Sequence, residues 1–258
     1  MPNDYAKLLA KLDRPPAGPN WVRFIRSDVN STAKAIISFA KGTPLFTYQP
    51  SYTAVRDRIQ FGIGRETALQ MVRRSGAPAG RVQNEKLVEA FYDFDEQRAY
   101  SAQNLVEFER GLFMVSREVR VPVAPLCVLF ENASFVPVFL CGWNSIPLTL
   151  VQRRLLVTIY EDAFLSLTDY QSAPAEFLFF PEMERNGVKR REAEVWHRGD
   201  YETLSAAELG ECVEIFIHAR DQARQILIDE WAAVLRRQSD VSGSSTSVEI
   251  KDLFSRKE

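Results

Sequence analysis

The chain has 258 residues and a net charge of −2. Hydrophobic residues make up 46% and charged residues 26%, which is the composition of a folded globular protein. No apolar stretch approaches the ~20 residues that span a bilayer, and the amino terminus lacks the apolar core of a secretory signal. The three cysteines are too few and too scattered for a disulfide framework or a closed zinc site, so we expect reduced thiols and a cytoplasmic location.

Charge is distributed unevenly along the chain. Residues 1–82 carry thirteen Lys and Arg against five Asp and Glu, a balance of +8, whereas residues 83–258 carry nineteen against twenty-nine, a balance of −10. A basic segment of this kind favours contact with nucleic acid or another anionic surface. The alternative is that the two parts of the chain dock on each other and neutralise their charges.

The first elements in the chain are helical. A short amphipathic helix is expected over residues 4–12, followed by a proline-stiffened linker at residues 15–20. A second helix is expected from Asn30 or Ser31 to about Phe39 or Lys41.

Residues 51–76 predict two helices separated by a glycine-containing break at residues 61–64. This outline resembles a helix-turn-helix motif, and the resemblance implies that the second helix presents Arg65, Thr67 and Gln70 to a groove of DNA. The arginines that remain available for phosphate contacts are Arg56, Arg58, Arg73 and Arg74. Ordinary packing of two helices is the alternative interpretation.

Helical periodicity continues over residues 84–110, with an apolar face that we expect to pack against the sheet that follows. The same segment carries a group of carboxylates, Glu89, Asp93, Asp95 and Glu96. Carboxylates can hold a hard cation, but on an exposed helix they are usually solvated, so we predict no metal site and no cofactor.

Residues 111–197 predict a sheet with one inserted helix. Strands are expected at residues 115–123, 126–130 and 135–141, and Pro137 suggests an edge or a bulge in the third. A helix over residues 148–167 begins with the capping-box pair Thr149 and Gln152. Residues 175–182 and 191–197 are then expected to form a hairpin around Asn186-Gly187.

This order of a helix, three strands, a helix and a fourth strand is similar to that of the PD-(D/E)XK nuclease family. In that family, the resemblance implies, acidic residues hold a metal and a lysine assists the attacking water. Glu131 follows the second strand here, whereas residues 135–141 contain neither an acid nor a lysine. The alternative hypothesis is therefore an active or degenerate nuclease-like hydrolase on this sheet, using Glu131, Glu182, Glu192 or His197.

The last helix is expected to run from a capping box at Ser205 and Glu208 to about Arg237. Residues 238–247 have the Ser/Gly composition of a flexible linker. Beyond them, Asp252, Leu253 and Phe254 resemble the end of the short motif with which bacterial proteins bind the replication sliding clamp. The alternatives are a frayed tail or a strand that docks on its own domain.

Together these patterns predict an α+β fold: a small N-terminal helical segment, then a mixed or antiparallel sheet flanked by helices, then a disordered C-terminal tail. The expected domains are a basic helical region at 1–82, an α+β core at 83–237 and a flexible tail at 238–258. The leading hypothesis is a non-enzymatic, nucleic-acid-associated or regulatory protein that binds DNA or RNA through the N-terminal arginines. A nuclease-like hydrolase and an adaptor that binds another protein are the alternatives.

Overall fold

The computed structural model describes the backbone of residues 2–100 and 105–252, and the side chains of residues 5–100 and 106–237. The helices are α1 (Pro2–Leu12), α2 (Gly18–Val22), α3 (Val29–Lys41), α4 (Gln49–Phe61), α5 (Arg65–Arg74), α6 (Arg81–Arg98), α7 (Leu150–Tyr160) and α8 (Ala206–Asp252). Short helical turns are η1 (Pro78–Gly80), η2 (Glu161–Leu165) and η3 (Thr168–Tyr170). The strands are β1 (Leu105–Val106), β2 (Gly111–Met114), β3 (Arg120–Val123), β4 (Cys127–Glu131), β5 (Ser134–Cys141), β6 (Glu176–Phe179), β7 (Glu182–Arg185), β8 (Val188–Arg191) and β9 (Glu194–His197).

A five-stranded mixed sheet in the order β1-β4-β5-β6-β9 lies at the centre of the molecule. Strands β5 and β6 run parallel and are connected through α7, whereas the other neighbours in this sheet are antiparallel. Two small antiparallel ribbons, β2-β3 and β7-β8, complete the strands. The predicted α+β class, with a mixed sheet flanked by helices, is confirmed.

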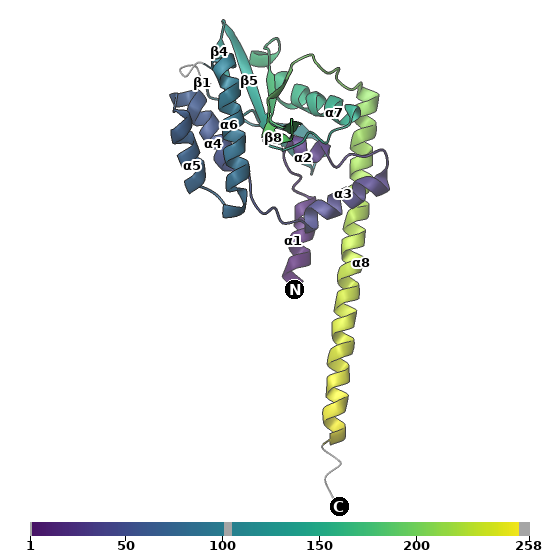
Figure 1. Cartoon of the computed structure of the whole chain (residues 1–258). Coiled ribbons are helices and arrows are strands. Elements are labelled where there is room, and N and C mark those ends of the chain that lie inside the picture. Colours follow the sequence, from purple (N-terminus) through teal and green to yellow (C-terminus); the bar gives the residue numbers. More distant parts are fainter. Residues whose placement is uncertain (1, 101–104, 253–258) are drawn as a thin grey trace, which may run out of the picture.

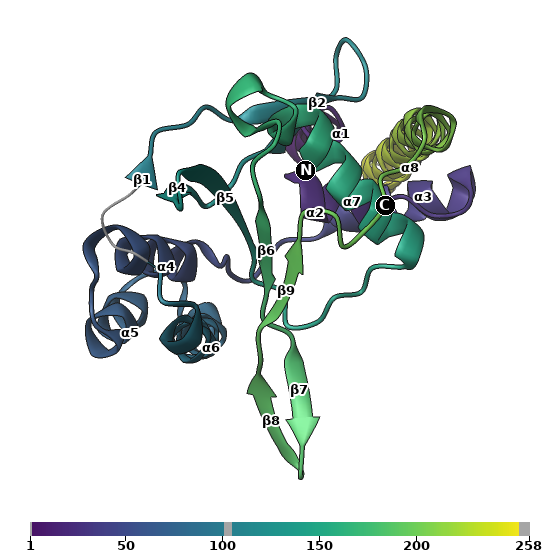
Figure 2. The ribbon, with the colours of Figure 1, turned by 90° about the horizontal axis from the view of Figure 1, so that it is seen from above.

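Helices cover both faces of this sheet, as Figure 2 shows, with α4, α5 and α6 on one side and α2, α3, α7 and α8 on the other. Side chains alternate between the faces of a strand, so neighbouring residues enter different cores. On β4, Cys127 and Leu129 join the core beneath α4–α6, whereas Val128 joins the core beneath α7 and α8. The predicted strand at residues 126–130 is apolar throughout because both of its faces are covered.

The α4–α6 layer begins with the predicted helical pair. Gly62 adopts a left-handed conformation, with φ of 66°, and ends α4 before α5 begins three residues later. Helix α6 packs against both of these helices. The expected domain boundary between residues 82 and 83 lies in the first turn of α6, and the division into domains stays a prediction.

On the other face, α3 and α1 lie along α8, which extends well beyond the rest of the molecule (Figure 1). The Trp21 side chain is fully buried, with its ring centroid 5.4 Å from that of Phe216 on α8. In the described part of the chain, no helix combines the length and the apolar character needed to cross a membrane. The predicted tail, residues 238–258, falls on the end of α8, where only the backbone is described, and on residues 253–258, which lie outside the description.

Two predicted elements were wrong in extent. The strand expected at 115–123 is a ribbon, β2-β3, whose connecting turn contains Val115 and Val119; both side chains are buried, which explains their strand-like spacing. The helix expected at 84–110 ends at Arg98, because Ala99 adopts a left-handed conformation with φ of 53° and β1 begins at Leu105.

The expectation that Pro137 marks an edge or a bulge was also wrong, because β5 lies between β4 and β6. Pro137 is opposite Val128 in the register with β4, and the pairing with β6 begins one residue later, at Val138. Hydrogen-bonded and non-hydrogen-bonded pairs alternate along an antiparallel ladder. Because the pairing with β6 begins at Val138, the missing N–H of Pro137 falls outside the stretch of β5 that pairs with β6.

Candidate functional site

Three of the arginines predicted to contact nucleic acid have carboxylate partners within the molecule. Arg58 lies 2.9 Å from the buried Asp95, and Arg65 lies 2.7 Å from Asp93. Arg73 lies 2.9 Å from Glu85 and its pKa is raised, mainly by the hydrogen bond to that carboxylate. Carboxylates of α6 thus neutralise part of the N-terminal charge surplus.

The other predicted residues on α5 are exposed. The Gln70 side chain donates a hydrogen bond to Glu66, at 3.4 Å, and Thr67 lies on the solvent side of the helix. Arg74 is exposed and makes no ion pair with any described residue. The face of α5 that was predicted to contact DNA is therefore accessible, but few of its arginines lack a carboxylate partner.

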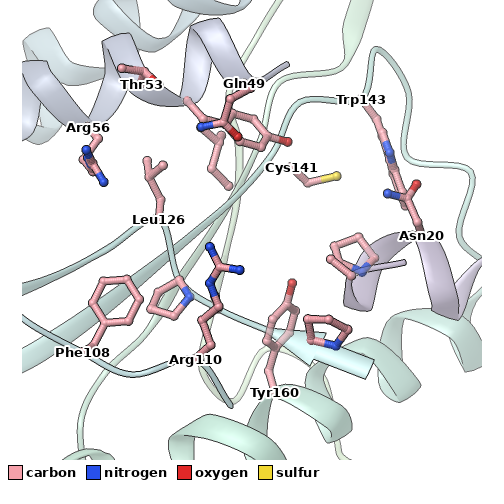
Figure 3. Close-up of a pocket in the computed structure, with 17 residues that line it drawn as sticks. Asn20, Gln49, Thr53, Arg56, Phe108, Arg110, Leu126, Cys141, Trp143 and Tyr160 are labelled. Atoms are coloured by element: carbon pink, nitrogen blue, oxygen red, sulfur yellow. The ribbon is translucent and has the colours of Figure 1, made fainter. Parts of the chain in front are cut away.

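Arg56 lies apart from this group and lines a cavity of about 440 Å³. One wall is α4, and the opposite wall includes α2 and the end of α7; the segment before β4 and the end of β5 close the space between them. The labelled residues in Figure 3 show this arrangement, with Arg56 and Thr53 on α4 and Tyr160 across from them.

A second arginine, Arg110, enters the cavity from the segment before β2, and its guanidinium points toward the middle of the space (Figure 3). The chain is tightly placed here, since a Cβ on the next residue, Gly111, would come within 2.2 Å of the Ala163 carbonyl oxygen. Neither Arg56 nor Arg110 makes a hydrogen bond or ion pair with any described residue. No Asp or Glu is among the described residues that line the cavity.

The thiol and the two tyrosine hydroxyls of the lining are kept neutral by burial. Burial raises the pKa of the Cys141 thiol to about 12 and the pKa of the Tyr160 hydroxyl well above its ordinary value. Burial also raises the pKa of Tyr52, whose hydroxyl accepts a hydrogen bond from the Gly142 backbone N–H at 2.9 Å. The two guanidinium groups are therefore the charged groups of the described lining.

Amide and aromatic side chains complete the walls. Asn20 and Gln49 contribute amides, and Trp143 and Phe108 contribute rings. The Arg23 guanidinium lies over the Trp143 ring, 4.7 Å from its centroid, and this contact helps to orient the indole. A cavity with these groups suits a ligand that is anionic at one point and carries a flat, hydrogen-bonding portion.

Of the cavity residues, only Arg56 belongs to the predicted site. Arg110 was missed because it was assigned to the end of a helix that stops twelve residues earlier, at Arg98. Tyr160 and Trp143 carry no local signal, because a tyrosine on a buried helix face and a tryptophan after a strand are common in ordinary cores.

Residues named for the hydrolase alternative are not assembled into one site. Glu131 lies 2.7 Å from Arg98, and Glu182 lies 2.8 Å from Lys86, whose hydrogen bond lowers the pKa of that carboxyl. Each of the other two has its own partner: Glu192 lies 2.6 Å from Arg185, and His197 lies 3.7 Å from Asp200. Across the described side chains, no three His, Cys, Asp or Glu residues are grouped so that they could hold a metal ion.

The tail residues Asp252, Leu253 and Phe254 lie outside the described side chains, so their role as a partner-binding motif stays a prediction.

Fold and site together define an α+β protein with an arginine-lined cavity between two helical layers. Comparison of the chain with protein-family models, curated proteins and solved structures finds no match.

Proposed function

We propose that this chain is a non-enzymatic, nucleic-acid-associated binding protein that takes a backbone phosphate into the cavity between α4 and α7. One observation carries the proposal: Arg56 and Arg110 line the same cavity, with no carboxylate among its described lining residues. Guanidinium groups bind phosphate with charge-assisted, often bidentate hydrogen bonds. Two such groups without an internal counter-ion favour an anion from outside the molecule.

The rest of the lining supports nucleic acid over a simple anion. Aromatic rings and amides are the groups that stack on bases and bond to their edges. Phe108, Trp143, Asn20 and Gln49 place both kinds in the same cavity as the arginines.

A binding role is supported by the chemistry of the described lining residues, which include no Asp, Glu, His or Lys. General acid–base catalysis requires a group that titrates near the working pH. The pKa of Cys141 is raised to about 12, and those of Tyr52 and Tyr160 are raised as well, all chiefly by burial. The buried, unpaired thiols of Cys127, Cys141 and Cys212 are in keeping with the cytoplasmic location that we propose.

Fluorescence anisotropy with labelled DNA and RNA at two salt concentrations tests the proposal. The double variant Arg56→Glu, Arg110→Glu is expected to bind at least about tenfold more weakly. The slope of log K against log salt should become shallower by about 0.7 to 0.9, because one phosphate contact is lost.

The matched control is Arg73→Glu with Arg74→Glu, which changes the charge equally but lies on α5, away from the cavity. Its binding should weaken much less. If the α5 variant loses binding and the cavity variant does not, the helix-turn-helix face is the site and the cavity is not. If the wild-type chain binds neither nucleic acid at low salt, the proposed function is wrong.

A further inference from the structure

The cavity has two chemically different ends. Arg56 and Phe108 lie at one end and Asn20 and Trp143 at the other, with the Arg110 guanidinium between them (Figure 3). A ligand that fills the cavity therefore meets charge at one end and neutral polar and aromatic groups at the other.

Tyr160 supplies a hydroxyl that faces the cavity and has no partner among the described residues. Its side chain is only 5% exposed, its hydroxyl points into the cavity, and that hydroxyl makes no hydrogen bond with any described residue. The ring is held by Phe139 and Phe177, with centroids 4.3 Å and 5.3 Å away. The hydroxyl oxygen is not among the described buried atoms that lack a partner, so it is accessible from the cavity and can donate a hydrogen bond to, or accept one from, a ligand atom.

Two amides of the lining are accessible to a ligand, since Asn20 is half-buried and Gln49 is exposed. The side chains of Asn20 and Gln49 line the cavity and make no hydrogen bond with the described residues. Amides offer both a donor and an acceptor, which matches the edge of a nucleobase. The Trp143 ring, with Arg23 over it, adds an aromatic surface to the lining.

We infer that the neutral end receives one unstacked nucleobase, so that the protein selects single-stranded nucleic acid over duplex. This inference rests on the proposed function, in which Arg56 and Arg110 hold the adjoining phosphate. A base can enter such a cavity only after it leaves the stack, and this step is easiest in a strand that is already single. The volume of about 440 Å³ lies in the range of pockets that enclose one small ligand.

Anisotropy titrations of the full chain with three labelled probes test the inference: a single strand of about twelve nucleotides, a duplex of the same sequence, and an abasic strand with the same number of phosphates. The single strand is expected to bind at least about tenfold more tightly than the other two. Tyr160→Phe should weaken binding of the single strand about fivefold, because one hydrogen bond to the base is lost, and should leave binding of the abasic strand unchanged.

Tyr92→Phe is the matched control, since it also removes one tyrosine hydroxyl, whose hydrogen bond goes to the Ile63 carbonyl instead of the cavity. It should bind all three probes as the wild type does. If the abasic strand or the duplex binds as tightly as the single strand, the inference is wrong. The proposed function still stands in that case if the double variant Arg56→Glu, Arg110→Glu binds these probes more weakly than the wild type does. If no probe binds, both are wrong.

Discussion

Arg191 is a buried cation held by neutral groups. Its side chain donates hydrogen bonds to the Gly142 carbonyl, the Tyr48 hydroxyl and the Gln83 side chain, each at 2.9 Å. No described carboxylate pairs with it, although the residue is only 6% exposed. The guanidinium thus ties the start of α4 to the segment that carries Trp143, and it positions two walls of the cavity.

Replacement of Arg191 by Met is expected to lower the free energy of unfolding by about 2–4 kcal/mol, because several buried acceptors lose their donor. Urea denaturation of wild type and variant measures the difference. Arg190→Met is the control, since Arg190 is exposed and makes no ion pair with a described residue, and it should change stability by less than ~0.5 kcal/mol. Equal effects of the two changes would show that the Arg191 hydrogen bonds contribute little.

At the scale of elements, the start of α8 is fixed by a capping box and an ion pair. The Ser205 and Glu208 side chains exchange hydrogen bonds with each other's backbone N–H, and Glu208 lies 2.9 Å from Arg154 on α7. The hydrogen bonds from Arg154 and then from Ser205 lower the pKa of Glu208 to about 2. These contacts join α8 to α7, the helix that carries Tyr160.

A carboxyl group whose pKa is lowered by folding stabilises the fold at pH values above its unfolded pKa, near 4.5. This contribution is lost as the pH falls toward the folded pKa of about 2. Glu208→Gln should therefore melt below the wild type at pH 7, and the two melting temperatures should converge as the pH falls below about 4.5. Thermal unfolding by circular dichroism across this range measures the effect. Glu211→Gln, an exposed neighbour with the same change of charge, should show a smaller difference. A Glu208→Gln difference that stays constant down to pH 2 would contradict the assignment.

At the scale of the whole molecule, two apolar cores lie on opposite faces of one sheet. Leu87 on α6 belongs to one and Leu155 on α7 to the other, and both are fully buried. Strands β4, β5 and β6 contribute residues to both cores. Loss of either helical layer would therefore expose one face of the strands that the other layer needs.

We expect Leu87→Ala and Leu155→Ala each to lower the free energy of unfolding by ~2–5 kcal/mol and to shift the same single transition. Far-ultraviolet circular dichroism and tryptophan fluorescence, recorded on the same denaturant series, should give coincident curves for the wild type and both variants. Two separated transitions, with only one moved by each variant, would show instead that the two cores on opposite faces of the sheet unfold independently.

The sequence by itself determined the elements whose causes are local. The capping box of Thr149 and Gln152 is present at the start of α7, and the predicted Asn186-Gly187 turn joins β7 and β8 with both residues at positive φ. The glycine break between α4 and α5 was also visible, because Gly62 is where the chain turns left-handed. Such features depend on residues three or four apart, so their pattern is complete in a short stretch of sequence.

Only the tertiary structure decided which charges remain available. The sequence shows a surplus of arginines, but the docking of α6 on α4 and α5 pairs Arg58, Arg65 and Arg73 with carboxylates. The tertiary structure also brings Arg56 into one cavity with Arg110, which is 54 positions later in the chain. The strength of a charge interaction depends on distance and surroundings in the folded state. The path of the chain between these residues, which no local pattern specifies, therefore selects the site.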